Sequence, residues 1–256
     1  MELFYGIASP GILVFAFCIS ILAGVIKGVV GFALPMVLVS GLGSVATAEV
    51  ALAGMILPTL VTNGWQALRQ GMRAALESLS RFKAFLVSGF LVMVVSAQFV
   101  PQVAGWLLLL VIGLLVTLFV SLQILGIQLR MPGHPGPKTQ AAIGSVAGFM
   151  GGLSGIWGPP TVAMLTALNT EKKEQIRIQG VIYGLGSVTL VAAHWGSGVL
   201  RAETLPLSLA LIPTAALGMA IGFRIQDRID QSTFRKATLA ILLLGGLNLV
   251  RRGLIG

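Results

Sequence analysis

The stretch Gly148–Pro160 lies inside a long apolar region and constrains the chain more than any other feature. It reads GFMGGLSGIWGPP, and no charged residue occurs between Lys138 and Glu171. Water does not reach backbone at membrane depth, so irregular backbone there must be buried in protein or line a cavity. Glycines permit the turns, and proline suits the first position of a helix. The stretch therefore predicts a break, followed by a helix from about Thr161.

The N-terminus of the helix predicted from about Thr161 is the first candidate for a binding site. The first N–H groups of a helix have no partner within the helix, and the helix dipole places partial positive charge beside them. Glycines in front of these groups leave them uncovered by side chains. The break therefore predicts a site for a small anion.

The same pattern occurs earlier in the chain. A shift of 124 positions aligns the two breaks at Ala23-Gly24 with Ala147-Gly148, Gly28 with Gly152, Gly31 with Gly155, and Pro35 with Pro159. Each copy follows the opening apolar arm of one half. We therefore predict two structural repeats, residues 1–130 and 131–256, joined by the proline-rich segment 130–138.

Composition assigns the class of protein. Hydrophobic residues make up 56% of the chain, charged residues 10%, and the mean hydropathy is +0.95. These values predict an all-α polytopic membrane protein. The net charge of +9 does not indicate nucleic acid, because the basic residues lie in short segments between apolar runs. Such basic loops are typical of membrane topology signals.

Uncharged runs predict the membrane segments. They are Leu3–Ile26, Val50–Leu68, two spans within Ala84–Leu129 divided at Pro101-Gln102, Ile178–Leu200, Thr204–Phe223 and Ala237–Val250. The last run has only 14 residues, or about 21 Å of helix, so it would need Arg251 and Arg252 to snorkel to the interface.

The positive-inside rule selects a topology. If each broken segment is a hairpin, the loops at 67–83, 127–138, 169–177 and 224–236 share one side and hold 13 of the 17 basic residues. If each broken segment instead crosses the membrane fully, the two sides of the membrane hold similar numbers of basic residues. The hairpin arrangement is therefore predicted, with those loops cytoplasmic and both termini periplasmic. Each half is then a broken-helix hairpin plus three transmembrane helices, which makes the repeats inverted, as in many secondary transporters.

The candidate ligands of the anion lie in and near the two breaks. The substrate head is predicted between Gly28–Pro35 and Ser154–Pro160. The break residues singled out are Lys27, Gly28, Gly31, Pro35, Gly152, Ser154, Gly155, Trp157, Gly158 and Pro159. On the spans that follow, Asn63, Gln66, Gln179 and Tyr183 either line the cavity or form hydrogen bonds between helices.

Two interpretations are open for each of three residues, Lys27, His194 and Trp157. Lys27 either partners the anion or snorkels from a helix end, since an ammonium at membrane depth is costly unless paired. His194, beside Trp195, suits interfacial packing more than a proton relay. Trp157 either roofs the site or only packs. Glu49 is expected at the membrane rim.

Several functional classes are disfavoured. The chain has two histidines, one cysteine (Cys18) and eight carboxylates, mostly in loops, and we find no cluster suited to a metal or to acid–base catalysis. It also lacks a Walker lysine motif. We therefore expect no enzyme activity, cofactor or metal. A carrier, an anion channel and a scaffold subunit stay open, as do a co-transported proton or sodium ion and a homodimer.

The paired glycine-rich breaks that end in proline, together with the chain length and the two halves, resemble the TauE/SafE sulfite exporter family, also called the toluene sulfonate uptake permeases. The resemblance covers essentially the whole chain. It implies a permease of the bacterial inner membrane that moves a sulfur-containing oxyanion such as sulfite, sulfoacetate or another organosulfonate. The residues themselves support only a small anion, so a carboxylate is the alternative substrate.

Overall fold

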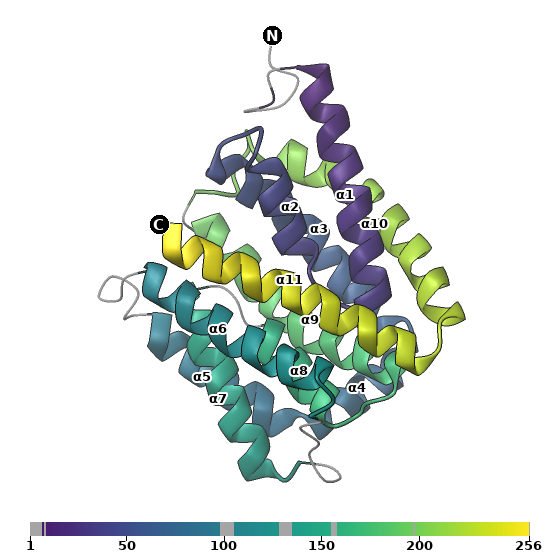
Figure 1. Ribbon diagram of the computed structural model, residues 1–256. Coiled ribbons are helices and arrows are strands. Elements are labelled where there is room, and N and C mark those ends of the chain that lie inside the picture. The colour runs from purple at the N-terminus through teal and green to yellow at the C-terminus, as the bar shows by residue number, and fades with distance from the viewer. Residues whose placement is uncertain are drawn as a thin grey trace. The chain divides into compact units, whose positions relative to one another are not determined.

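The computed structural model describes residues 7, 9–97, 105–127, 135–154, 158–196 and 198–255. Every regular element in these ranges is an α-helix (Figure 1): α1 Pro10–Val30, α2 Leu34–Leu42, α3 Ala48–Leu68, α4 Met72–Arg81, α5 Lys83–Ala97, α6 Gly105–Ile124, α7 Pro137–Ser154, α8 Gly158–Ala167, α9 Lys172–Gly196, α10 Leu205–Arg228 and α11 Gln231–Ile255.

The long helices confirm the predicted class of membrane protein. Among the described residues, α1, α9, α10 and α11 are each long and apolar enough to cross a bilayer. The pair α4–α5, bent by 69°, brings the number to as many as five. The short helices α2 and α8 have nine and ten residues, about half of the 20 or so that a span requires.

Local sequence explains where the helices of the first half begin. The Ser9 hydroxyl accepts a hydrogen bond from the Ile12 N–H at 3.3 Å, and Pro10 occupies the first turn of α1. The Thr47 hydroxyl caps α3 in the same way, accepting from the Val50 N–H at 3.3 Å. These side chains bond N–H groups that have no partner within the helix.

Several charged segments that the sequence assigns to loops are helical. The loop expected at 67–83 contains α4, and only two residues separate Arg228, at the end of α10, from Gln231, at the start of α11. The final helix therefore has 25 residues rather than 14, about 37 Å at 1.5 Å per residue. Charged residues end an apolar run without ending a helix, because lysine, arginine and glutamate are good helix formers.

The chain forms two compact units, and each draws helices from both halves of the sequence. The first comprises Met1–Ala75 with Ile176–Asp230, and the second Leu76–Gln175 with Gln231–Gly256. In the first unit α1 packs on α2 and on α10, and α10 also packs on α3. Its core is an apolar cluster that includes Ala23, Leu34, Ile56 and Leu211.

Glycines set the close approach of α1 to α10. A Cβ built on Gly24 would lie 2.2 Å from the Ala215 carbonyl oxygen, and one on Gly218 would lie 2.1 Å from the Ile21 carbonyl oxygen. A Cβ on Gly28 would lie 2.8 Å from Cα of Gly222. Backbone therefore touches backbone along this pair, as small residues allow in membrane helices. Because both numberings rise together along the contact, α1 and α10 run parallel.

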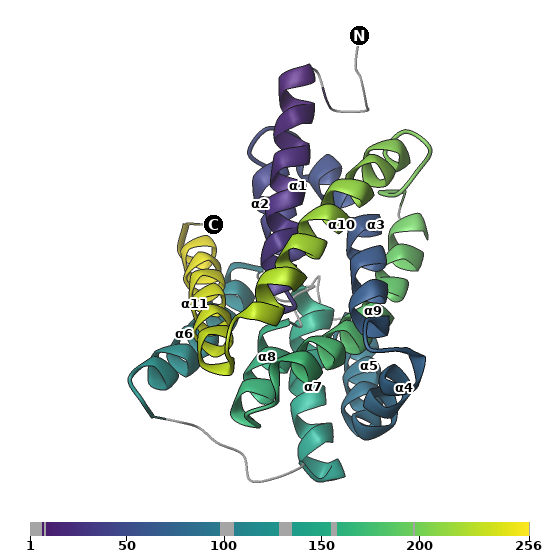
Figure 2. The same cartoon turned by 90° about the vertical axis from the view of Figure 1, so that its right-hand side faces the viewer.

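In the second unit α5 packs on α7 and α6 packs on α11 (Figure 2). The α5–α7 contact is also lined by glycine: a Cβ on Gly148 would lie 2.0 Å from the Gly89 carbonyl oxygen, and one on Gly144 would lie 2.3 Å from the Phe85 carbonyl oxygen. In the α6–α11 pair, Gly113 lies against the backbone of Gly246.

Candidate anion site

The first break is a short turn of three residues, Gly31 to Ala33, between α1 and α2. Gly31 has φ +87° and Ala33 has φ +78°, both in the left-handed region. Pro35 lies in the first turn of α2, as the sequence predicts. Helix α2 packs back against α1 (Figure 1).

The break exposes fewer N–H groups than the sequence suggests. Lys27 and Gly28 belong to α1, and the Gly31 N–H donates to the Lys27 carbonyl oxygen at 2.6 Å. Among the described residues we find no acceptor for the N–H groups of Phe32 and Leu34. Both residues are buried. These two groups are among the backbone donors that the break can offer to a ligand.

Lys27 is the main electrostatic feature of this region. It is only 1% exposed, and its ammonium donates to Oδ1 of Asn63 on α3. Among the described residues Lys27 forms no ion pair. Because Asn63 is neutral, the charge of Lys27 is not compensated by this contact. Lys27 is therefore not a snorkelling side chain, since its amine lies inside the protein.

Asn63 links Lys27 to α9. Its Nδ2 donates to the Tyr183 carbonyl oxygen and to Oγ of Ser187, both at 3.1 Å. The Ser187 hydroxyl in turn donates to the Tyr183 carbonyl oxygen at 2.7 Å. All of these side chains are buried. Sequence analysis did not single out Ser187, although adding the repeat shift of 124 to position 63 points to it.

Gln66 and Gln179 bond the carbonyl end of α1. Nε2 of Gln66 donates to the carbonyl oxygens of Gly31 at 2.9 Å and Ile176 at 2.7 Å. With its amide oriented to satisfy both atoms, Gln179 donates to the carbonyl oxygens of Val30 at 3.1 Å and Gly31 at 3.0 Å. These contacts favour the alternative interpretation of both glutamines, hydrogen bonding between helices.

The two helices that flank the second break extend further into it than the sequence predicts. Helix α7 runs through Gly152 and Ser154, and α8 begins at Gly158 rather than at about Thr161. Pro159 therefore lies in the first turn, where a proline loses no intrahelical bond. Gly155 and Trp157 lie outside the described residues.

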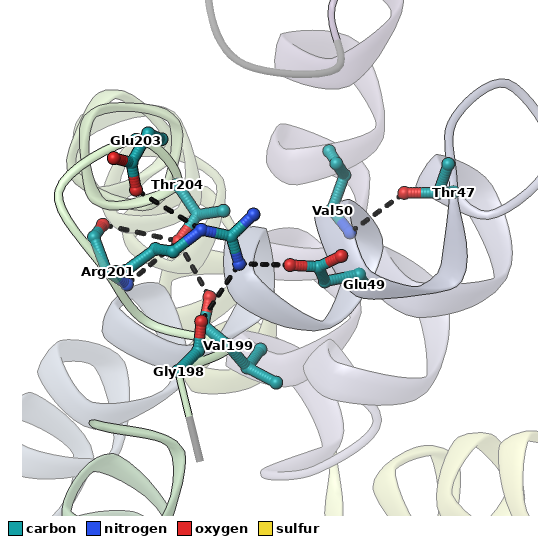
Figure 3. Close-up of polar contacts among 8 residues, drawn as sticks. All are labelled: Thr47, Glu49, Val50, Gly198, Val199, Arg201, Glu203 and Thr204. Atoms are coloured by element: carbon teal, nitrogen blue, oxygen red, sulfur yellow. Dashed lines mark hydrogen bonds and ion pairs between the residues drawn. The ribbon is translucent and has the colours of Figure 1, made fainter. Parts of the chain in front are cut away.

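Two ion pairs connect α3 with α10 and the loop before it. Near the start of α3, Glu49 pairs with Arg201, which also pairs with Glu203 (Figure 3). Just after the end of α3, Arg69 pairs with Asp227 near the end of α10 at 2.6 Å. Glu49 is partly exposed, at 42% of its side chain, and its position at the membrane rim stays a prediction. His194 provides a carbonyl that accepts the Leu200 N–H at 2.9 Å.

The described part of the chain contains no group of three or more histidine, cysteine or acidic residues that could hold a metal ion.

Comparison with known proteins gives one family. Residues 16–249 match the family model described as Sulfite exporter TauE/SafE. No curated protein and no solved structure gives a significant match. The family match covers nearly the whole chain and agrees with the resemblance drawn from the breaks.

Proposed function

The chain belongs to the sulfite exporter TauE/SafE family, and from this premise we propose that it carries a sulfur oxyanion, sulfite or a small organosulfonate, through a site that includes Lys27. The family is one of integral membrane transporters, not enzymes, and its members move sulfite-type anions. The proposal adds the chemical identity of the substrate and the residues that bind it.

The observation that carries the proposal is the buried amine of Lys27, whose contact is the neutral amide of Asn63. A buried charge without an ionic partner costs several kcal/mol, and an arriving anion would offset that cost. The amide oxygen of Asn63 occupies the place that an anionic oxygen would take. We propose that the substrate replaces Asn63 as the acceptor for Lys27.

Backbone groups of the first break complete the proposed site. Phe32 and Leu34 follow Lys27 by five and seven positions, beyond the end of α1, and both residues are buried. A hydrogen bond to a charged group contributes about 1.5–3 kcal/mol. Two or three such bonds that outlast desolvation would give a binding free energy near −8 kcal/mol, or roughly micromolar affinity. Gly152, Ser154, Gly155, Trp157, Gly158 and Pro159 stay predicted ligands through the sequence repeat.

The inverted repeat is part of the proposal, and helix pairing supports it. A shift of 124 positions aligns Ser20 with Gly144 and Gly24 with Gly148. Ser20 donates to the Leu211 carbonyl oxygen at 3.1 Å, while Gly144 touches the Phe85 carbonyl. The first helix of each half thus packs on a late helix of the other half. Secondary transporters with inverted repeats hold their substrate near the midplane, at broken helices.

The test measures anion binding by two variants of Lys27. Purified protein is titrated with sulfite, a small sulfonate and a carboxylate of similar size while its thermal unfolding is followed. We expect the wild type to be stabilised by the sulfur oxyanions, because a ligand that binds only the folded state raises its stability. Lys27→Met should lose this stabilisation, and Lys27→Arg should restore it only partly, since the two cations differ in shape and hydration.

The unfolding temperature of each variant without ligand is the control for this experiment. Lys27→Met should unfold at the wild-type temperature or above, because it removes a buried charge that has no ionic partner. Sulfonate binding by Lys27→Met at wild-type affinity would refute the site. Stabilisation by the carboxylate alone would refute the substrate class and leave the site intact. Saturable flux in liposomes then separates a carrier from a channel.

A further inference from the structure

A small polar cavity lies in the second unit, where the end of α8 meets the first turns of α9 and α11. It has room for about one water-sized molecule. The residues that line it are Thr166, Asn169, Thr170, Gln175, Gln231, Phe234, Arg235 and Thr238. The proposed substrate site uses none of these residues.

Three buried side chains around this cavity have polar atoms without a hydrogen-bond partner. They are Oγ1 of Thr166, Nε2 of Gln175 and Oγ1 of Thr238, on residues that are 6%, 3% and 1% exposed. Leaving a buried polar group unpaired destabilises the folded state. Three such groups around one cavity indicate a missing ligand rather than three separate defects.

The two threonines differ from the buried threonines of α3. Thr59 and Thr62 on α3 donate to carbonyl oxygens four residues earlier, each at 2.6 Å. A buried threonine in a helix commonly satisfies its hydroxyl in this way. Thr166 and Thr238 make no such bond. Their hydroxyl groups are therefore available to a ligand in the cavity.

The charges around the cavity favour an anion. No carboxylate lines it, whereas Arg235 does and is held by Oε1 of Gln123 at 2.6 Å. Gln231 fixes the neighbouring loop, because its amide donates to the Thr170 carbonyl oxygen and accepts the Lys172 N–H, both at 2.9 Å. The first turns of α9 and α11 add the positive ends of two helix dipoles, against the negative end of one, that of α8.

We infer that this cavity binds a monatomic anion of halide size, chloride in the cell. A halide accepts hydrogen bonds from both threonine hydroxyls and from the Gln175 amide at once, and it donates none. A water molecule accepts only two and must itself donate two. A sulfonate exceeds the space of about one water. The cavity is therefore a second anion site, separate from Lys27, and it would make the stability of the second unit dependent on chloride.

The test compares anions at constant ionic strength. Full-length protein in detergent is unfolded thermally in sodium gluconate, chloride and bromide. We expect chloride and bromide to raise the unfolding temperature by roughly 5–10 °C at concentrations 100-fold above Kd. Thr238→Val and Thr166→Val should lose this difference between salts. Thr233→Val, an exposed position on the same helix, should keep it. Crystals grown in bromide should show an anomalous peak in the cavity.

Each outcome decides the inference. Equal unfolding temperatures in the three salts, with no bromide peak, would show that the cavity holds water and would overturn it. A halide effect that survives in both valine variants would place the site elsewhere. If Thr238→Val does not fold, Thr166→Val and the bromide peak decide.

Discussion

Asn63 and Ser187 lie 124 positions apart in the chain, and the Asn63 amide donates a hydrogen bond to the Ser187 hydroxyl at 3.1 Å. The same shift aligns the two glycine-rich breaks. Around this bond α3 and α9 run antiparallel, because Gln66 reaches Ile176 and Gln70 accepts from Arg177. If the halves are inverted repeats, their pseudo-twofold axis passes between these two residues. Lys27 then lies beside that axis.

Asn63→Asp should convert the neutral partner of Lys27 into an internal counter-ion. The new carboxylate would pair with the ammonium and occupy the place proposed for the substrate. We expect a loss of at least ten-fold in sulfonate affinity, measured by thermal-shift titration, with the protein still folded. Ten-fold corresponds to about 1.4 kcal/mol, well within the strength of a buried ion pair.

Asn63→Ala is the matched control for that variant. It removes the amide without adding charge, so Lys27 stays available to an external anion. We expect the alanine variant to bind the sulfonate more tightly than the aspartate variant, although it loses stability. Equal affinity in the two variants would show that charge at position 63 does not matter for binding.

Gly31→Ala should distort the first break by two separable effects. Gly31 has φ +87°, and its added Cβ would lie 1.8 Å from the Gln179 amide. Gly71 has φ +89° but nothing within 4 Å of an added Cβ, so Gly71→Ala measures the backbone term alone, roughly 1 kcal/mol. We expect Gly31→Ala to be the less stable variant and to lose anion binding. Equal unfolding temperatures would mean that the Gln179 contact contributes nothing.

The glycines between α1 and α10 should tolerate no side chain. Gly24→Ala and Gly218→Ala each place a methyl group about 2 Å from a backbone carbonyl oxygen, which neither helix can avoid without separating. We expect each to lower the unfolding temperature by several degrees. Gly64→Ala, with open space around it, should be neutral or slightly stabilising, because alanine favours a helix. Similar losses in all three variants would contradict close packing as the cause.

The topology makes a prediction for chemical labelling. Ser80 on α4 and Ser232 on α11 are exposed and belong to segments predicted to be cytoplasmic. Single cysteines at these positions, with Cys18 replaced, should resist a membrane-impermeant thiol reagent in whole cells and react after permeabilisation. Labelling of either cysteine in intact cells would exclude the proposed inverted repeats.

Sequence patterns predict the class and the positions of the breaks more reliably than the roles of single residues. Pro35 and Pro159 lie in first helical turns because proline geometry is local. Gly28 reads like a break residue in sequence, but its backbone lies against Gly222 on α10. Glycine serves turns and close helix contacts equally well, so only the tertiary structure separates the two roles.

Polar residues in the spans show the same limit. The sequence places Gln66 and Gln179 after the two hairpins and allows either a ligand or a helix as their partner. The structure directs both amides to the carbonyl end of α1. The sequence does not mark Ser187 as a candidate site residue, because serine is common in membrane helices. Its importance lies in its pairing with Asn63, which depends on how α3 and α9 cross.

The distribution of helices between the two units has a consequence for biosynthesis. Helices α1 and α3 lack their partner α10 until Leu205–Arg228 has been made, and α6 lacks α11 until Gln231–Ile255 follows. The first half, inserted on its own, would leave the backbone of Gly24 and Gly28 facing lipid. Neither unit can complete its packing before its late helix, α10 or α11, has been synthesised. A truncation before Leu205 should therefore yield a chain that quality-control proteases remove.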